Sequence, residues 1–218
     1  MKTTLLKLYA KRWMMACFLV LATVTANGQI TYDHPVSSDV IIRDLQTLMD
    51  KFCRYVETIG TTKTVNSAKI SKLRTDSVPK LFYEYDSCFM YTTYANKGRM
   101  KERKEMKRYF RNLETQAQRK YNTITYDLDF ELICSGDGFQ WKEDTSKKYR
   151  NGAKCYSAEI LVMQRYIREG GSISGDGASR KIEDDFKTMK VWKIMLDNRT
   201  IVGLGSVERI ERVYTQGR

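Results

Sequence analysis

The sequence predicts an α+β domain in which N-terminal helices pack on an antiparallel sheet. Apolar residues recur every three or four positions over 41–59, as in an amphipathic helix. They alternate with polar residues over 126–134 and 156–162, as in strands with one buried face. The helical patterns come first along the chain and the strand patterns come last, an order typical of α+β domains.

The first 28 residues have the pattern of a cleavable export signal. A basic stretch without acidic residues precedes an apolar run over about 13–24, and small residues follow up to Gly28. The cations of this stretch are Lys2, Lys7, Lys11 and Arg12. We expect cleavage after Gly28 and a single mature domain over 29–218. The apolar run is shorter than the roughly 20 residues of a membrane span, so no span is expected after cleavage.

Cys17 leaves a second interpretation of this signal open, that of a lipoprotein. A lipid-modified cysteine directly follows a small residue at the end of the apolar run. Cys17 follows Ala16 but lies at the front of the run, which favours an ordinary apolar residue of the signal. The sequence therefore predicts an exported protein, periplasmic or extracellular, of a bacterium.

Export determines which partners the basic charge of the chain can meet. The net charge is +12, and loss of the four signal cations leaves about +8. Outside the cytoplasm the abundant polyanions are lipid headgroups, polysaccharides and peptidoglycan. We therefore expect an envelope polyanion, another protein or a small ligand as partner. Nucleic acid is not expected, because no recognised binding motif accompanies the charge.

The mature sequence begins with a strong helical pattern. Ser38 or Asp39 can cap a helix that Gly60 ends. Its apolar positions are Ile41, Leu45, Leu48, Phe52, Val56 and Ile59. The next stretch, 61–75, is rich in Thr, Ser and Lys, which suits a loop or a weak second helix.

The following segment mixes helical and alternating patterns. We expect a short helix that ends at Tyr85, a strand over about 86–93 and a turn at 96–98. A long amphipathic helix is predicted over 100–120. Its apolar face holds Met106, Tyr109, Phe110, Leu113 and Ala117.

The second half of the chain predicts four antiparallel strands. A strand starts near Asn122 and a long one covers about 154–168, so these two are expected to form a hairpin. A Gly/Ser-rich stretch over 169–179 predicts a flexible loop. Two more strands, about 186–196 and 200–210, are joined at a tight turn that contains Asp197 and Asn198.

Four cysteines remain after cleavage of the signal: Cys53, Cys88, Cys134 and Cys155. In an exported protein they can form two disulfides, or they can stay as buried thiols. A symmetric hairpin would place Cys134 opposite Cys155, which makes this pair the first choice for a disulfide. No CxxC pair or His/Cys cluster at metal-ligand spacing is present, so no metal site is expected.

This order of elements resembles the nuclear transport factor 2-like (cystatin-like) superfamily. The resemblance rests on the aromatic strand 86–91, the helical segment 106–113, and the closing pair 191–194 and 201–203. It implies helices packed on a strongly curved antiparallel sheet, which together form a cone with one open mouth. The stretches 135–152 and 170–179 depart from the compact pattern of that superfamily.

The resemblance also implies where an enzyme of this superfamily would carry its acid-base group, an Asp or His inside the cone. The only histidine, His34, precedes the first helix and is expected on the surface. Asp127, Asp129 and Glu131 alternate with apolar residues, so they are expected on the outer, solvated face. We therefore expect no catalytic residues and no cofactor.

Two sets of residues are candidates for binding. An aromatic set on the expected inner face, Tyr126, Tyr156, Tyr166 and Trp192, either lines a pocket for an apolar or sugar-like ligand or packs in the core. A basic set on the predicted long helix either holds an anionic partner or forms an ordinary solvated face. It comprises Lys101, Arg103, Lys104, Lys107 and Arg108.

The sequence thus predicts an exported, non-enzymatic binding or interaction domain whose ligand it does not name. Two alternatives remain open. The first is a small lyase, isomerase or hydrolase of the same superfamily that uses a buried Asp or Tyr. The second is a structural component of a cell-envelope assembly.

Overall fold

A computed structural model of the chain describes residues 38–61, 67–93, 101–119, 122–133, 139–145, 155–173, 178–197 and 200–215. Several sequence predictions fall outside these ranges. They are the export signal with Cys17, His34, the turn at 96–98, and the positions of Cys134 and Asn198. Among the described residues, no helix combines the length and the apolar character that crossing a membrane requires.

The first described element is helix α2, Ser38–Gly60, and it confirms the predicted boundaries. Its buried face holds Ile41, Leu45, Met49, Phe52, Val56 and Ile59. Gly60 ends the helix directly beside the ring of Tyr126. A Cβ atom at Gly60 would lie 2.7 Å from that ring, so only glycine allows this close approach.

Short helical segments connect α2 to the first strand. Helix α3, Ser67–Lys72, continues into a π-helical turn, Leu73–Ser77. Two 3-10 turns follow, Val78–Leu81 and Tyr85–Ser87. They lead to strand β1, Phe89–Thr93, close to the predicted position of the strand.

The next element corrects the sequence prediction of one helix over 100–120. Residues Lys101–Glu105 form strand β2, which pairs antiparallel with β1. Helix α4 covers only Met106–Ala117, and its first N–H donates to the carbonyl oxygen of Cys88 at 2.8 Å. The segment Lys-Glu-Arg-Lys-Glu has no apolar periodicity, so pairing with the neighbouring strand decides its structure.

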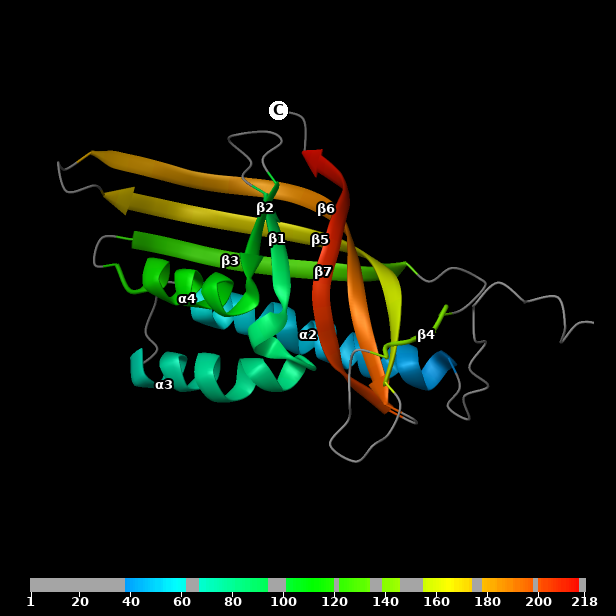
Figure 1. Ribbon diagram of the computed structural model, residues 1–218. Helices are drawn as coiled ribbons and strands as arrows, with labels where there is room; N and C mark the ends of the chain where they lie inside the picture. Colours follow the sequence, from blue (N-terminus) through cyan, green and yellow to red (C-terminus); the bar gives the residue numbers. More distant parts are fainter. Residues whose placement is uncertain are drawn as a thin grey trace, which may run out of the picture. The chain divides into compact units, whose positions relative to one another are not determined.

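The main sheet is antiparallel and has the strand order β3-β5-β6-β7 (Figure 1). Its strands are β3 (Asn122–Ile133), β5 (Cys155–Ile173), β6 (Ser179–Asp197) and β7 (Thr200–Thr215). A fifth, short strand, β4 (Lys142–Glu143), pairs with the start of β5. The α+β class and the four long antiparallel strands are therefore confirmed.

The predicted Gly/Ser loop at 169–179 is wrong over most of its length. The ladder between β5 and β6 continues to Ile173 opposite Ser179. Gly170 has a φ of 145°, and a Cβ atom there would overlap the carbonyl oxygen of Thr123 on β3. This glycine therefore lets neighbouring backbones approach within a sheet, a role that composition does not distinguish from a loop.

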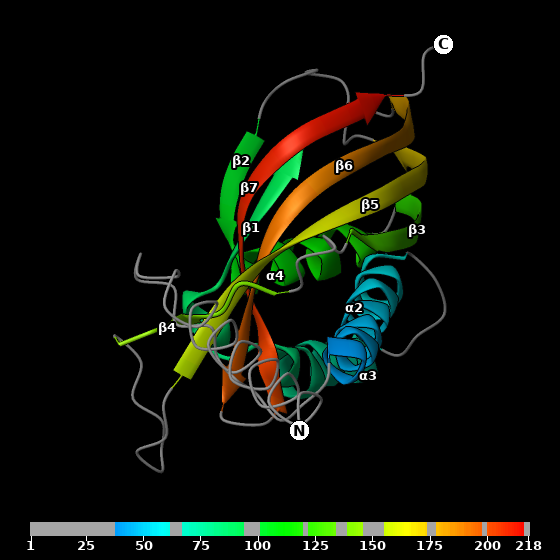
Figure 2. The ribbon, with the colours of Figure 1, turned by 90° about the vertical axis from the view of Figure 1, so that its right-hand side faces the viewer.

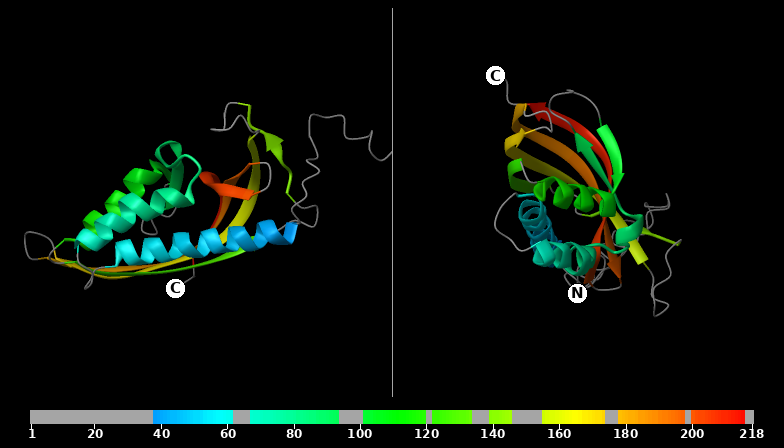
Figure 3. Two further views of the ribbon diagram at one scale, coloured as in Figure 1. Left: turned by 90° about the horizontal axis from the view of Figure 1, so that it is seen from below. Right: turned by 90° about the vertical axis from the view of Figure 1, so that its left-hand side faces the viewer.

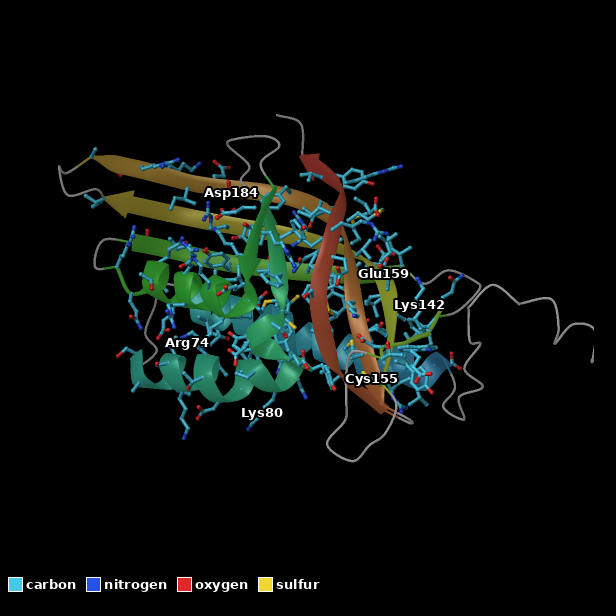
Figure 4. All side chains as sticks on the ribbon, in the orientation of Figure 1. Arg74, Lys80, Lys142, Cys155, Glu159 and Asp184 are labelled. Carbon is cyan, nitrogen blue, oxygen red and sulfur yellow. The ribbon has the colours of Figure 1, made fainter. Side chains whose placement is uncertain are left out.

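The helices lie on one face of the main sheet, with α2 along its length and α4 beside α2 (Figures 2 and 3). An aromatic cluster fills the core between these layers. The ring of Phe52 on α2 meets Phe82, Phe110 and Trp192 edge to face, at centroid distances of 6.3, 5.8 and 5.2 Å. Arg74 in the π-helical turn, labelled in Figure 4, also forms an ion pair with Glu114 on α4.

Candidate ligand pocket

A pocket of about 70 Å³ lies between the inner face of the sheet and helix α4. Strands β1, β2, β3, β5 and β6 and helix α4 all contribute to it. Its lining residues are Thr92, Lys104, Tyr109, Asn112, Leu113, Gln116, Tyr126, Tyr166, Arg168 and Asp184. We call this site the tyrosine pocket.

The register of the sheet brings the polar floor of the tyrosine pocket together. Arg168 on β5 lies opposite Tyr126 on β3 and opposite Asp184 on β6. Residues directly opposite one another in a ladder point to the same face, here the inner face. Arg168 Nε donates to Asp184 Oδ2 at 2.8 Å, and the Asp184 residue is only 5% exposed. The two opposite charges therefore neutralise each other inside the protein.

Three tyrosines surround this ion pair. The rings of Tyr126 and Tyr166 meet edge to face, with centroids 5.7 Å apart. The hydroxyl of Tyr126 donates to Oε1 of Gln116 on α4, at 3.3 Å. Burial raises the pKa of Tyr109, Tyr126 and Tyr166. The three hydroxyls therefore stay protonated and can donate hydrogen bonds across the physiological pH range.

The electrostatics of Arg168 follow from the same contacts. Burial lowers the pKa of its guanidinium, but the neighbouring Tyr166 and Asp184 raise the pKa more, so the net shift is upward. The guanidinium is therefore always charged. Asp184 is its counter-ion. The second cation of the lining, Lys104, forms an ion pair with Glu102 at 3.0 Å, and the other hydrogen-bonding groups are hydroxyls and the amides of Asn112 and Gln116.

The pocket contains two of the four aromatic residues that the sequence suggested, Tyr126 and Tyr166. The other two are not among its lining residues. Tyr156 is 5% exposed and lies opposite Leu196, far along β5. Trp192 is fully buried against Phe52 in the core. For these two residues the structure fits the core-packing interpretation.

Sequence reasoning missed Arg168 and Asp184. Strand β6 carries Asp184, but the sequence predicts that this strand starts only at Phe186, so Asp184 is not expected on the inner face. The residues of α4 reach the pocket only because the helix packs on the sheet, and sequence periodicity does not show how a helix packs. The useful signal was the parity of β6, since Asp184 has the same parity as the buried residues Phe186 and Thr188.

The basic set does not lie on a single helix. Lys101, Arg103 and Lys104 are on β2, whereas Lys107 and Arg108 are on α4. Arg103 is exposed, with its guanidinium carbon 3.7 Å from the ring centroid of Phe89. Lys104 pairs with Glu102 at 3.0 Å, and Lys107 pairs with Asp86 at 3.2 Å. The charge is therefore divided between two elements and is partly neutralised.

The acidic row Asp127, Asp129 and Glu131 is exposed, as predicted. The cysteine pair stays a prediction, because Cys134 lies outside the described residues. The ladder of β3 and β5 ends with Ile133 opposite Leu161, and Cys155, which is 1% exposed, lies opposite Asp197 on β6. The hairpin is therefore not symmetric in the way that motivated the pairing.

Residues that could hold a metal ion do not cluster in the described part of the chain. A second, larger hollow of about 430 Å³ lies along the sheet from the tyrosine pocket, and Figure 4 shows its Lys142 and Glu159 well away from Asp184. Two of its charges already have partners, since Lys193 pairs with Asp144 and Glu159 with Arg209. No family model, no curated protein and no solved structure matches this chain.

Proposed function

We propose that this protein is an exported, non-enzymatic binding domain that holds a neutral, hydroxyl- or amide-bearing group of a saccharide in the tyrosine pocket. The observation that carries the proposal is that three tyrosines with protonated hydroxyls line one small pocket whose floor is a buried ion pair. Few polar groups at fixed positions, set among aromatic faces, are typical of small-molecule sites.

The size and charge of the pocket support this ligand class. A volume of about 70 Å³ has room for roughly five waters, so it accepts a pendant group of a few non-hydrogen atoms and not a whole sugar ring. Each cation of the lining has an acidic partner, since Arg168 pairs with Asp184 and Lys104 pairs with Glu102, and this favours a neutral group over an anion. Tyrosine rings pack against the apolar part of such a pendant group, and their hydroxyls bond to its polar atoms.

The proposal also includes export of the protein from the cytoplasm and a cone-like shape of the sheet. Export rests on the basic, apolar and small-residue order of the first 28 residues. A cone of the nuclear transport factor 2-like type rests on the order of the elements. The register shifts at four places along β6 and β7 support it too, since such irregularities bend strands.

The state of Asp184 favours binding over catalysis. Among the described residues that line the tyrosine pocket, it is the only carboxylate, and it already forms an ion pair with Arg168. Its Oδ2 already accepts a hydrogen bond from Arg168 Nε at 2.8 Å, so it is less available to take a proton from a ligand. A lyase or isomerase would need an available base in this place.

The test is a titration of the exported protein with N-acetylglucosamine, the neutral sugar of peptidoglycan, followed by saturation-transfer NMR. Tyr166→Phe and Tyr126→Phe each remove one hydroxyl, and we expect binding to weaken roughly three- to tenfold for each. Tyr156→Phe is the matched control on the same strand and face, outside the pocket, and should bind as the wild type does. No saturation transfer, or equal losses in all three variants, would refute the proposal.

A further inference from the structure

The outer face of the main sheet carries an ordered pattern of side chains. The helices cover the other face (Figure 3). Cross-strand partners define rows that run from β3 to β7 on the outer face. One row is Glu131, Met163, Met189 and Arg212. The next is Ile133, Leu161, Val191 and Arg209, and the row on the other side is Asp129, Arg165, Lys187 and Tyr214.

The centre of this face is apolar. We call the side chains of Ile133, Leu161, Met163 and Met189 the apolar strip, and Val191 beside them is buried. Leu161, Met163 and Met189 are half-buried, although no described helix covers them. Among the described residues, the large apolar side chains that are exposed are Ile133, Ile173 and Tyr214. All three point to the outer face, because they have the parity of the rows above. Apolar groups gathered on one face indicate a partner surface.

Opposite charges flank the apolar strip. Its β3 side carries the acidic row, Asp127, Asp129 and Glu131, all exposed. Its other side carries Lys187 on β6 and Arg212 on β7, also exposed. Neither cation forms an ion pair within the described part of the chain, whereas Arg209 is held by Glu159 and Glu211. We call Lys187 and Arg212 the basic edge, although β7 also carries the exposed Glu208 and Glu211. One face thus has an acidic row on β3, an apolar centre, and two cations without an ion pair on β6 and β7.

This pattern is complementary to itself. In two sheets packed face to face about a two-fold axis parallel to the strands, β3 of each copy lies over β7 of the other. The acidic row then meets the basic edge, and Glu131 faces Arg212 of the second copy. A two-fold axis across the strands would instead place β3 on β3, with acid against acid. A polyanion would meet the same acidic row, so it suits this face less well.

We propose that the protein forms a homodimer through the outer face of its sheet, with the apolar strip at the centre and Glu131 paired with Arg212 of the other copy. The proposal goes beyond the binding function and does not depend on the tyrosine pocket, which lies on the inner face. Within one copy Glu131 and Arg212 are three strand spacings apart, about 14 Å, so they form no ion pair with each other.

The test is the mass of the exported protein in solution, measured by light scattering and sedimentation over a range of concentrations. We expect a dimer, and we expect Glu131→Lys to weaken dimerisation at least about tenfold by placing like charges together. Arg212→Glu should do the same. The double variant, Glu131→Lys with Arg212→Glu, should restore the dimer, because each new pair again has opposite charges.

Asp44→Lys, a charge reversal at an exposed position of α2, is the matched control and should leave the dimer unchanged. Met163→Lys changes the apolar strip without touching either charged edge, and it should also give a monomer. Circular dichroism checks that each variant is folded. A wild type that is monomeric at all concentrations would overturn the proposal, as would a double variant that dimerises no better than the single ones.

Discussion

Glu57 on α2 accepts a hydrogen bond from the backbone N–H of Leu128 on β3, at 2.8 Å from N to Oε1. Leu128 lies on the end strand of the main sheet, and this N–H faces away from the neighbouring strand. The N–H of Tyr126 donates in the same way to Oγ1 of Thr61 at 3.3 Å, and that of Phe130 to Oδ1 of Asp129 at 2.8 Å. Side chains therefore occupy the open edge, which protects it from pairing with other chains and holds Tyr126 in place.

Removing the Glu57 carboxylate should destabilise the fold. Glu57→Leu leaves the N–H of Leu128 facing an apolar side chain, and we expect the free energy of unfolding to fall by about 1–3 kcal/mol in a urea titration. Glu57→Gln keeps an acceptor oxygen on a side chain of the same length, so its free energy of unfolding should fall much less. Equal losses in the two variants would show that the hydrogen bond is not the cause.

The helix and the strands with clear periodicity could be predicted from the sequence, but other elements could not. Five of the six apolar positions predicted for α2 are buried, with Met49 in place of the half-buried Leu48. Alternation placed Tyr126 and Tyr166 on the inner side of the sheet. Strand β2 has only charged residues, so its pairing with β1 decides its structure. Arg168 and Asp184 come together through the register of two strands, and register depends on contacts distant in sequence.

A substitution at Gly170 should be far more harmful than one at its neighbour. Gly170→Ala places a methyl group on the carbonyl of Thr123 at a positive φ, and we expect a loss of at least about 2 kcal/mol in the free energy of unfolding. A Cβ atom at Gly171 would lie 3.4 Å from Oγ1 of Thr123 and 3.9 Å from the carbonyl oxygen of Arg180, both ordinary contacts. Gly171→Ala is therefore the control, and chemical denaturation of both variants compares them.

Lys190 is a buried amine whose partner among the described residues is the amide oxygen of Gln164, at 2.9 Å. Burial lowers its pKa from 10.5 to about 8. The unfolded chain therefore binds this proton more tightly, so stability should rise as the pH increases from about 8 towards 10.5. Burial also raises the pKa of Cys53 to about 12, which makes stability fall above pH 9, so the measurement is best made between pH 7 and 9.

Lys190→Met should remove this pH dependence. The variant has no buried ammonium group to desolvate, and we expect it to be more stable than the wild type at pH 7, with the difference narrowing by pH 9. Thermal unfolding at several pH values measures both effects. Lys51→Met, at an exposed position of α2, is the control and should follow the wild-type curve. A Lys190→Met variant with the wild-type pH profile would contradict the assignment.

Removing one partner of the ion pair on the floor of the tyrosine pocket should destabilise the fold much more than removing both partners. Arg168→Met leaves the carboxylate of Asp184, which is 5% exposed, without its counter-ion. We expect the free energy of unfolding to fall by about 3–5 kcal/mol in a denaturant titration. The double variant Arg168→Met with Asp184→Leu has no unpaired charge, so it should regain most of that stability. A double variant as unstable as Arg168→Met would indicate that packing, not charge, causes the loss.

The most direct test of the proposed function is a crystal structure of the exported protein soaked with N-acetylglucosamine. We predict that a substituent of the sugar enters the tyrosine pocket, within hydrogen-bond distance of the hydroxyls of Tyr126 and Tyr166. Soaked Tyr166→Phe crystals should show weaker occupancy at the same place. A pocket that stays free of sugar in the wild-type crystals, or a sugar bound only elsewhere on the protein, would contradict the account.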